Sequence, residues 1–134
     1  MKERNAIICI DDEPIILASL VEQLERYFGS AYVYEEAESA EEAFEIIEDL
    51  EDEEIEIEII VCDWLMPGMK GDEFLLKMDL KYPRTAKVLL TGQADEKSVY
   101  ELRQVADKFA TVYKPWDKDE LINTIKSQLK WVDK

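Results

Sequence analysis

The chain of 134 residues contains no histidine, and this absence excludes imidazole from every chemical role in the protein. Catalysis by histidine, histidine metal ligands and a phosphohistidine within the chain are therefore ruled out. Cysteine is also scarce, because only Cys9 and Cys62 are present, and both lie inside apolar runs. That setting is typical of small buried side chains in a reducing compartment, and a disulfide or redox pair is the less favoured interpretation. Chemistry on protons, metals or phosphate must depend on oxygen and ammonium groups.

Long apolar runs are missing as well. The runs "AIICI" at 6–10 and "IIVC" at 59–62 are far shorter than the roughly 20 residues that span a bilayer. Acidic residues follow the first run too soon for a secretory signal. We therefore expect a cytoplasmic protein that does not bind membranes.

Positive charge is the third scarcity, since no lysine or arginine lies between Arg26 and Lys70. The net charge is −16, and residues 1–69 hold 3 basic and 21 acidic side chains, against 13 and 11 in residues 70–134. Such a surface repels phosphates and anionic lipid, which disfavours direct binding of nucleic acid or membranes. The densest acidic segment, 48–58, is predicted to be a solvated helix end and loop, with a docking patch for a basic partner as the alternative.

What is present is a regular alternation of short apolar runs and stretches of helical period. Strands are predicted at 6–10, 31–35, 57–62, 87–91 and 109–113. Helices are predicted from Pro14 to Gly29, from a Ser39/Glu42 capping box to about Leu50, from 71 to before Pro83, at 95–107, and from Asp117 through Leu129. Strict alternation of strands and helices predicts one α/β domain over 1–134, with a core at about 6–130. Its five-stranded parallel sheet is doubly wound in the order 2-1-3-4-5, as in flavodoxin-like folds.

Polar residues follow four of the five predicted strands at their C-terminal ends. These residues are Asp11 and Asp12, Asp63, Thr91, and Lys114. In the order 2-1-3-4-5 the first and third strands are neighbours, so the three aspartates should converge. Their mutual repulsion favours Lys114 or a hard divalent cation such as Mg²⁺ (or Mn²⁺) beside them. Asp63 would then be a nucleophile that forms an acyl phosphate, with Thr91 and Lys114 on the phosphoryl oxygens.

Each of these features alone has a simpler interpretation. Acidic residues before Pro14 can cap a helix, a threonine at a strand end can cap or pack, and a lysine before proline can simply be exposed. The coincidence of all five at the same predicted edge favours the functional interpretation.

The motifs "ICIDDEP", "VCDWLMPGMKG", "LLTG" and "YKPW" resemble those of the receiver domain of two-component response regulators, from about Ile7 to Leu129. The resemblance implies that Asp63 accepts a phosphoryl group from a phosphohistidine on a sensor histidine kinase or phosphotransfer protein. It implies that Asp11, Asp12, Asp63 and the backbone carbonyl of Leu65 bind Mg²⁺. It also implies roles for Thr91 and Lys114 on the phosphoryl oxygens, and a cis peptide bond between Lys114 and Pro115.

The family's output surface comprises the fourth helix, the fifth strand and the fifth helix, here 95–107, 109–113 and 117–129. It implies an effector domain or protein as partner, and a homodimer through the same surface is a further expectation. The chain departs from the family pattern here, since Thr111 stands where a switch aromatic is usual. Phe109 and Tyr113 flank it and should share its face of the strand. We expect the 70–134 half to carry the output interface while the acidic half stays solvated.

Three other functions remain as alternatives. A small Mg²⁺-dependent phosphatase with an aspartyl phosphate usually has a second carboxylate two residues after the nucleophile, but that position is Leu65. A nucleotide or flavin binder needs a glycine-rich loop after the first strand, where "DDEP" would repel phosphate. A receiver-like interaction module that is never phosphorylated is the third. Whether the chain acts alone or with a following effector domain stays open.

Overall fold

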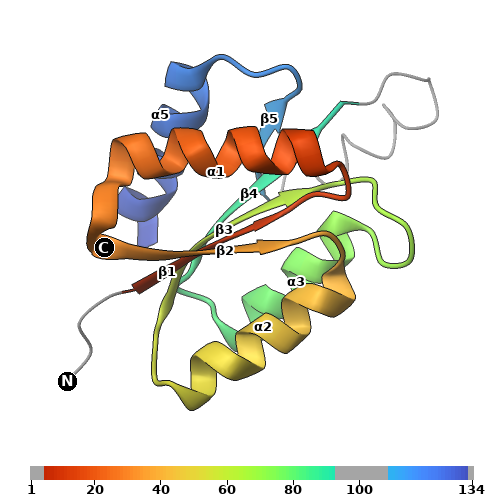
Figure 1. The fold of residues 1–134 in the computed structure, drawn as a ribbon, viewed down its shortest axis with the longest axis vertical. Coiled ribbons are helices and arrows are strands. Elements are labelled where there is room, and N and C mark those ends of the chain that lie inside the picture. Colours follow the sequence, from red (N-terminus) through yellow and green to blue (C-terminus); the bar gives the residue numbers. More distant parts are fainter. Residues whose placement is uncertain (1–4, 93–108, 133–134) are drawn as a thin grey trace.

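The computed structural model describes residues 5–92 and 109–132, which form a parallel sheet between two layers of helices (Figure 1). The strands are β1 (Asn5–Ile10), β2 (Tyr32–Ala37), β3 (Ile57–Asp63), β4 (Ala86–Thr91) and β5 (Ala110–Tyr113). The helices are α1 (Pro14–Phe28), the 3-10 turn η1 (Gly29–Ala31), α2 (Ala40–Asp52), α3 (Gly71–Lys81) and α5 (Lys118–Val132). The sheet order is β2-β1-β3-β4-β5 with every pair parallel, so the predicted α/β topology is confirmed.

Apolar side chains form a core on each face of the sheet. Helices α1 and α5 cover one face and α2 and α3 cover the other (Figure 1). Cys9 packs on the α1/α5 face and Cys62 on the α2/α3 face, and both are buried free thiols. Because strand residues alternate between faces, the two cysteines are separated by the sheet, which confirms the prediction of buried thiols.

Local sequence sets the ends of the first two helices. Pro14 begins α1, and Gly29 after its last residue has a φ of 76°, a left-handed value that favours glycine. The Ser39 hydroxyl accepts a hydrogen bond from the Glu42 amide (3.1 Å) at the start of α2. The Glu42 carboxylate accepts one from the backbone amide of Glu38 (2.7 Å), one residue earlier than in the usual capping box.

Two strands differ in detail from their predicted form. The second was predicted at 31–35, but pairing with β1 continues to Ala37, and η1 occupies residue 31. In β3 the register with β1 shifts, since Ala6 pairs with Ile57 and Ile7 with Ile59. Glu58 is therefore an extra bulge residue. The run "IEIEIIVC" stops alternating because the later residues of β3 are buried in the cores on both faces of the sheet. The Glu58 carboxylate accepts hydrogen bonds from Asn5 (3.1 Å) and the Tyr32 hydroxyl.

The helix predicted at 95–107 lies outside the described residues. In the described ranges, we find no helix with the length and apolar character needed to cross a bilayer.

The Ser39 cap yields a stability prediction. Ser39→Ala should lower the free energy of unfolding by about 1 kcal/mol, because the Glu42 amide loses its acceptor. The matched control is Ser127→Ala within α5, where alanine is the better helix former and stability should be unchanged or slightly higher. Urea denaturation measures both, and equal effects of the two substitutions would contradict the assigned cap.

Candidate functional site

The C-terminal ends of β1, β3, β4 and β5 meet at one edge of the sheet. Asp63 ends β3 and pairs with Leu90, while Thr91 ends β4 and pairs with Tyr113. The Lys114 amide donates a hydrogen bond to the Thr91 carbonyl (2.8 Å), which extends the ladder by one residue. Parallel pairing therefore brings side chains from distant parts of the sequence to the same edge.

Three carboxylates gather at this edge. Single oxygens of Asp11, Asp12 and Asp63 all lie within 4.8 Å of one another. Asp11 is fully buried, Asp63 is 5% exposed and Asp12 is half-buried. The predicted convergence of these aspartates is thus present in the structure.

The Lys114 ammonium is the cation that compensates them. Its Nζ lies 2.8 Å from Asp11 Oδ2 and 3.3 Å from Asp63 Oδ1. A third carboxylate, Glu13 at the mouth of the site, lies 3.4 Å away. Asp11 also accepts a hydrogen bond from the Glu13 amide (2.9 Å), which orients its carboxylate.

Burial and charge shift the pKa values of the two central groups. Burial, followed by repulsion from Asp11, raises the pKa of Asp63 to about 7, although the Lys114 charge opposes this shift. Burial lowers the pKa of Lys114, but the hydrogen bond to Asp11 and the charge of Asp63 outweigh it and raise that pKa overall. The Lys114 ammonium is therefore held in its charged form. The positive charge near Asp63 is not enough to let this carboxyl ionise in the pH range that is ordinary for aspartate.

The geometry fits a hard divalent cation. Mg²⁺ binds oxygen ligands at about 2.0 to 2.1 Å in an octahedron, so two of its ligand oxygens are about 2.9 Å apart when adjacent and about 4.2 Å apart when opposite. Oxygens of the three carboxylates already lie within 4.8 Å of one another, which is close enough for one ion to be bound between them. A cation there would also supply the charge that Asp63 lacks, so the donor set and the electrostatics both suit Mg²⁺.

The loop after β3 fixes the backbone of Asp63. The amide of Trp64 donates to the Leu90 carbonyl (2.8 Å), and the Gly71 amide donates to the Trp64 carbonyl (2.7 Å). The Trp64 ring is 1% exposed, and its Nε1 donates to Asp72 (3.1 Å). This loop is thus held by hydrogen bonds to β4 and to the first turn of α3 directly after Asp63.

The remaining predicted residues take simple positions. Thr91 is buried at the end of β4. The Leu65 side chain is 42% exposed and has no atom that binds a metal, so only the backbone carbonyl of Leu65 can be a ligand. The peptide bond from Lys114 to Pro115 is cis, as predicted.

Two residues of the site were not predicted. Glu13 lay inside the quoted "DDEP", but the sequence did not show that its side chain reaches Lys114. Gly71 lay inside "VCDWLMPGMKG", and a Cβ there would stand 2.1 Å from the Asp63 carbonyl oxygen. The sequence signal that could have predicted the role of Gly71 is a glycine at the start of a helix, shortly after a strand that ends in a functional residue.

Comparison with known proteins identifies the chain. The sequence model of the response regulator receiver domain matches residues 7–126. The chain belongs to this family. A response regulator receiver domain protein (CheY-like) from Methanospirillum hungatei JF-1 is 30% identical, with a TM-score of 0.75 and 97% of each chain covered. The signal receiver domain of an HD domain-containing protein from Pseudomonas fluorescens Pf-5 is 25% identical, with a TM-score of 0.78 over 97% of this chain and 98% of that one.

Curated relatives are much longer than this receiver domain. Hydrogenase transcriptional regulatory protein HoxA of Cupriavidus necator is 30% identical over 70 residues, which are 52% of this chain and 14% of HoxA. Hybrid signal transduction histidine kinase D of Dictyostelium discoideum is 30% identical over 120 residues, 87% of this chain and 7% of the kinase. The receiver domain thus matches a small part of each relative.

Gly71 yields a prediction on the receiver's site. Gly71→Ala should destabilise the fold by roughly 1 to 3 kcal/mol, because the new methyl group meets backbone atoms of Asp63 and Trp64 that cannot move freely. Gly92→Ala is the matched control, since its Cβ would meet only the Lys114 side chain at 3.5 Å, an ordinary contact. Thermal unfolding measures both, and similar losses would contradict the close approach.

The raised pKa of Asp63 yields a second prediction. The unfolded carboxyl ionises near pH 3.8 and the folded one near 7, so without metal the folded state loses stability as pH rises between these values. Asp63→Asn removes this loss and should be more stable than the parent by roughly 1 to 4 kcal/mol at about pH 8 in EDTA.

That advantage should shrink as the pH falls and disappear below about pH 3.8, where the Asp63 carboxyl is protonated in both the folded and the unfolded state. Chemical denaturation across this pH range checks the expectation. A stability difference that does not depend on pH would show that Asp63 ionises normally.

Proposed function

We propose that this receiver domain is a phosphoacceptor of a two-component pathway. The observation that carries the proposal is Asp63, a buried carboxylate that ends β3 beside Asp11 and Asp12 and contacts the Lys114 ammonium. Because these 134 residues contain no histidine, the donor phosphohistidine lies outside them, on a sensor histidine kinase or a phosphotransfer protein. A single domain over 1–134 and a cytoplasmic location are part of the same proposal.

The reaction is a transfer between two side chains. A carboxylate oxygen of Asp63 attacks the phosphorus, an O–P bond forms, and the N–P bond to the donor imidazole breaks with its electron pair on nitrogen. The nucleophile must be ionised, so the raised pKa of Asp63 makes added positive charge a requirement of this step.

The surrounding residues have separate tasks. The Lys114 ammonium, already 3.3 Å from Asp63, binds one phosphoryl oxygen, and the Thr91 hydroxyl binds another. Asp11, Asp12, Asp63 and the Leu65 carbonyl hold Mg²⁺, which neutralises charge on the transferring group when bound. Glu13 stands at the entrance and keeps Lys114 in place through its 3.4 Å contact.

The product is a signal and not a released metabolite. Thr111 stands on β5 where the family usually has a switch aromatic. It is partly buried, and its hydroxyl donates a hydrogen bond to the Phe109 carbonyl (3.1 Å). Phe109 is buried in the α2/α3-side core, whereas Tyr113 is 55% exposed. Tyr113 is therefore the aromatic that a partner can contact on β5. The surface of 95–107, β5 and α5 would bind an effector or a second copy, although residues 95–107 lie outside the described part.

Phosphorylation of the intact chain tests the proposal. Incubation with acetyl phosphate and Mg²⁺ should add one phosphoryl group, detected by intact-protein mass spectrometry, and EDTA should prevent it. Asp63→Asn should abolish the addition, and Lys114→Met should reduce it by roughly tenfold or more through loss of a charged contact to the phosphoryl group.

The matched control is Asp52→Asn at the exposed end of α2, which should behave like the parent. Beryllofluoride, a phosphoryl mimic, should raise the melting temperature of the parent and of Asp52→Asn, but not of Asp63→Asn. If the parent takes up neither reagent, the chain is a receiver-like interaction module. If Asp63→Asn is phosphorylated like the parent, the acceptor is a different residue.

A further inference from the structure

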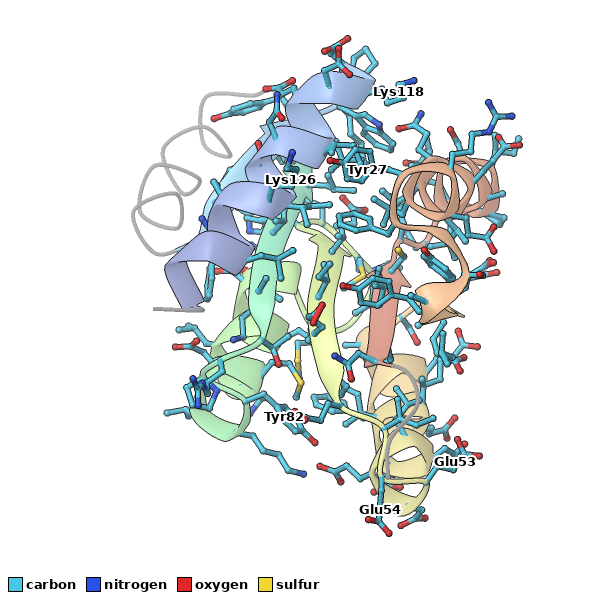
Figure 2. All side chains as sticks on the ribbon, turned by 90° about the vertical axis from the view of Figure 1, so that its left-hand side faces the viewer. Tyr27, Glu53, Glu54, Tyr82, Lys118 and Lys126 are labelled. Atoms are coloured by element: carbon cyan, nitrogen blue, oxygen red, sulfur yellow. The ribbon has the colours of Figure 1, made fainter. Side chains whose placement is uncertain are left out.

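A groove of about 340 Å³ lies between α1 and α5, away from the carboxylate cluster. Its walls include Arg26 and Tyr27 from α1 and Lys118, Ile122 and Lys126 from α5. The three α5 residues are spaced four apart, so they share one face of that helix. Figure 2 shows Tyr27 between the two helices, with Lys126 beside it and Lys118 toward the start of α5.

The charge of this groove is opposite to that of the chain. Arg26, Lys118 and Lys126 line it with one acid, Asp119, whereas the whole chain has 32 acidic and 16 basic residues. Among the described residues, neither Lys118 nor Lys126 has a carboxylate within ion-pair distance. The two ammonium groups are therefore open to an anionic partner.

Lys118 is placed against local electrostatics. It is the first residue of α5, where the helix macrodipole is positive and acidic residues are favoured. Asp117 already caps that end, since its carboxylate accepts a hydrogen bond from the Glu120 amide (3.2 Å). Helix stability therefore does not account for a lysine at this position, and its ammonium is available to an external contact.

An aromatic ring accompanies these charges. Tyr27 is 51% exposed, and the Lys126 ammonium lies 5.5 Å from its ring centre. One end of the groove is fixed, because Trp116 Nε1, in the segment before α5, donates to the Gln23 side chain of α1 (2.7 Å). The groove thus combines cations, one exposed ring and a defined spacing between helices.

We propose that the groove between α1 and α5 is a docking surface for an acidic segment of a partner protein. Small-molecule sites are mostly apolar and enclose their ligand, whereas this groove has only Ile122 as a buried aliphatic residue and its Arg26 side chain is 75% exposed. Carboxylates of the partner pair with Lys118 and Lys126, while Arg26 is already ion-paired with Glu22 (3.4 Å), and an apolar side chain rests on the Tyr27 ring. Complementary charge then selects the partner and speeds its approach.

A second copy of this chain fits the groove less well. The densest acidic segment of such a copy is 48–58, and Glu53 and Glu54 in it lie at the opposite end of the molecule from Lys118 (Figure 2). Two chains of net charge −16 also repel each other.

The test uses the full chain, labelled with ¹⁵N, and a capped synthetic peptide with glutamates on both sides of a central phenylalanine. At low ionic strength, amide resonances of the α1 and α5 residues that line the groove should shift, and added salt should reverse the shifts. Lys118→Glu should weaken binding by roughly tenfold or more, because attraction becomes repulsion at the contact. Since glutamate suits the first turn of a helix, this variant should remain folded.

Lys77→Glu is the matched control, because it makes the same charge change at an exposed position of α3. It should weaken binding far less than Lys118→Glu, and Tyr27→Ser should weaken binding through loss of the ring. Equal effects of Lys77→Glu and Lys118→Glu, or absence of peptide binding, would overturn the proposal.

Binding of inorganic tripolyphosphate without the peptide would reassign the groove to phosphate ligands. Self-association that Lys118→Glu abolishes, measured by sedimentation, would reassign it to a second copy.

Discussion

The contact of the Lys114 ammonium with Asp11 and Asp63 is the interaction on which the functional edge of this receiver domain depends. Two buried carboxylates at adjacent strand ends repel each other strongly in a cleft of low polarity. Lys114 is the cation within 4 Å of both in the described residues. Its charge is not sufficient, since the pKa of Asp63 stays raised, and this remaining deficit of positive charge is what makes the site receptive to a metal and a phosphoryl group.

The fold supplies the rigidity that this interaction needs. Asp63 is the last residue of a strand paired on both sides, and the next amide, that of Trp64, continues the pairing to β4. Gly71 lets the start of α3 approach the Asp63 carbonyl more closely than any other residue could. A carboxylate on such a backbone cannot move away from its like-charged neighbours, so charge compensation, and not rearrangement, determines its ionisation.

The α/β class and the edge residues were predictable because they depend on periodicity and on the geometry of parallel sheets. The alternation of apolar runs and helices placed Asp11, Asp12, Asp63, Thr91 and Lys114 after strand ends at one edge, whereas the order 2-1-3-4-5 was one of the doubly wound orders and periodicity alone does not select it. What could not be predicted depends on three-dimensional contacts between distant residues. The bulge at Glu58 is stabilised by Asn5 and Tyr32, and β2 extends to Ala37 through pairing with β1. The reach of Glu13 to Lys114 likewise follows from the placement of β5.

The distribution of charge links the phosphoacceptor site to the groove between α1 and α5. The N-terminal half of the chain supplies the carboxylates and the C-terminal half supplies Lys114, so the site exists only because the Lys114 side chain, just after β5, reaches past β4 to Asp63 and Asp11. Two residues beyond Lys114, Trp116 is hydrogen-bonded to Gln23, which lines the groove. The segment that follows Lys114 therefore contacts both the phosphoacceptor site and the groove. Any coupling through it would be reciprocal: the factor by which a phosphoryl group changed the affinity of the groove for its partner would equal the factor by which the partner changed the affinity of the site for its anion.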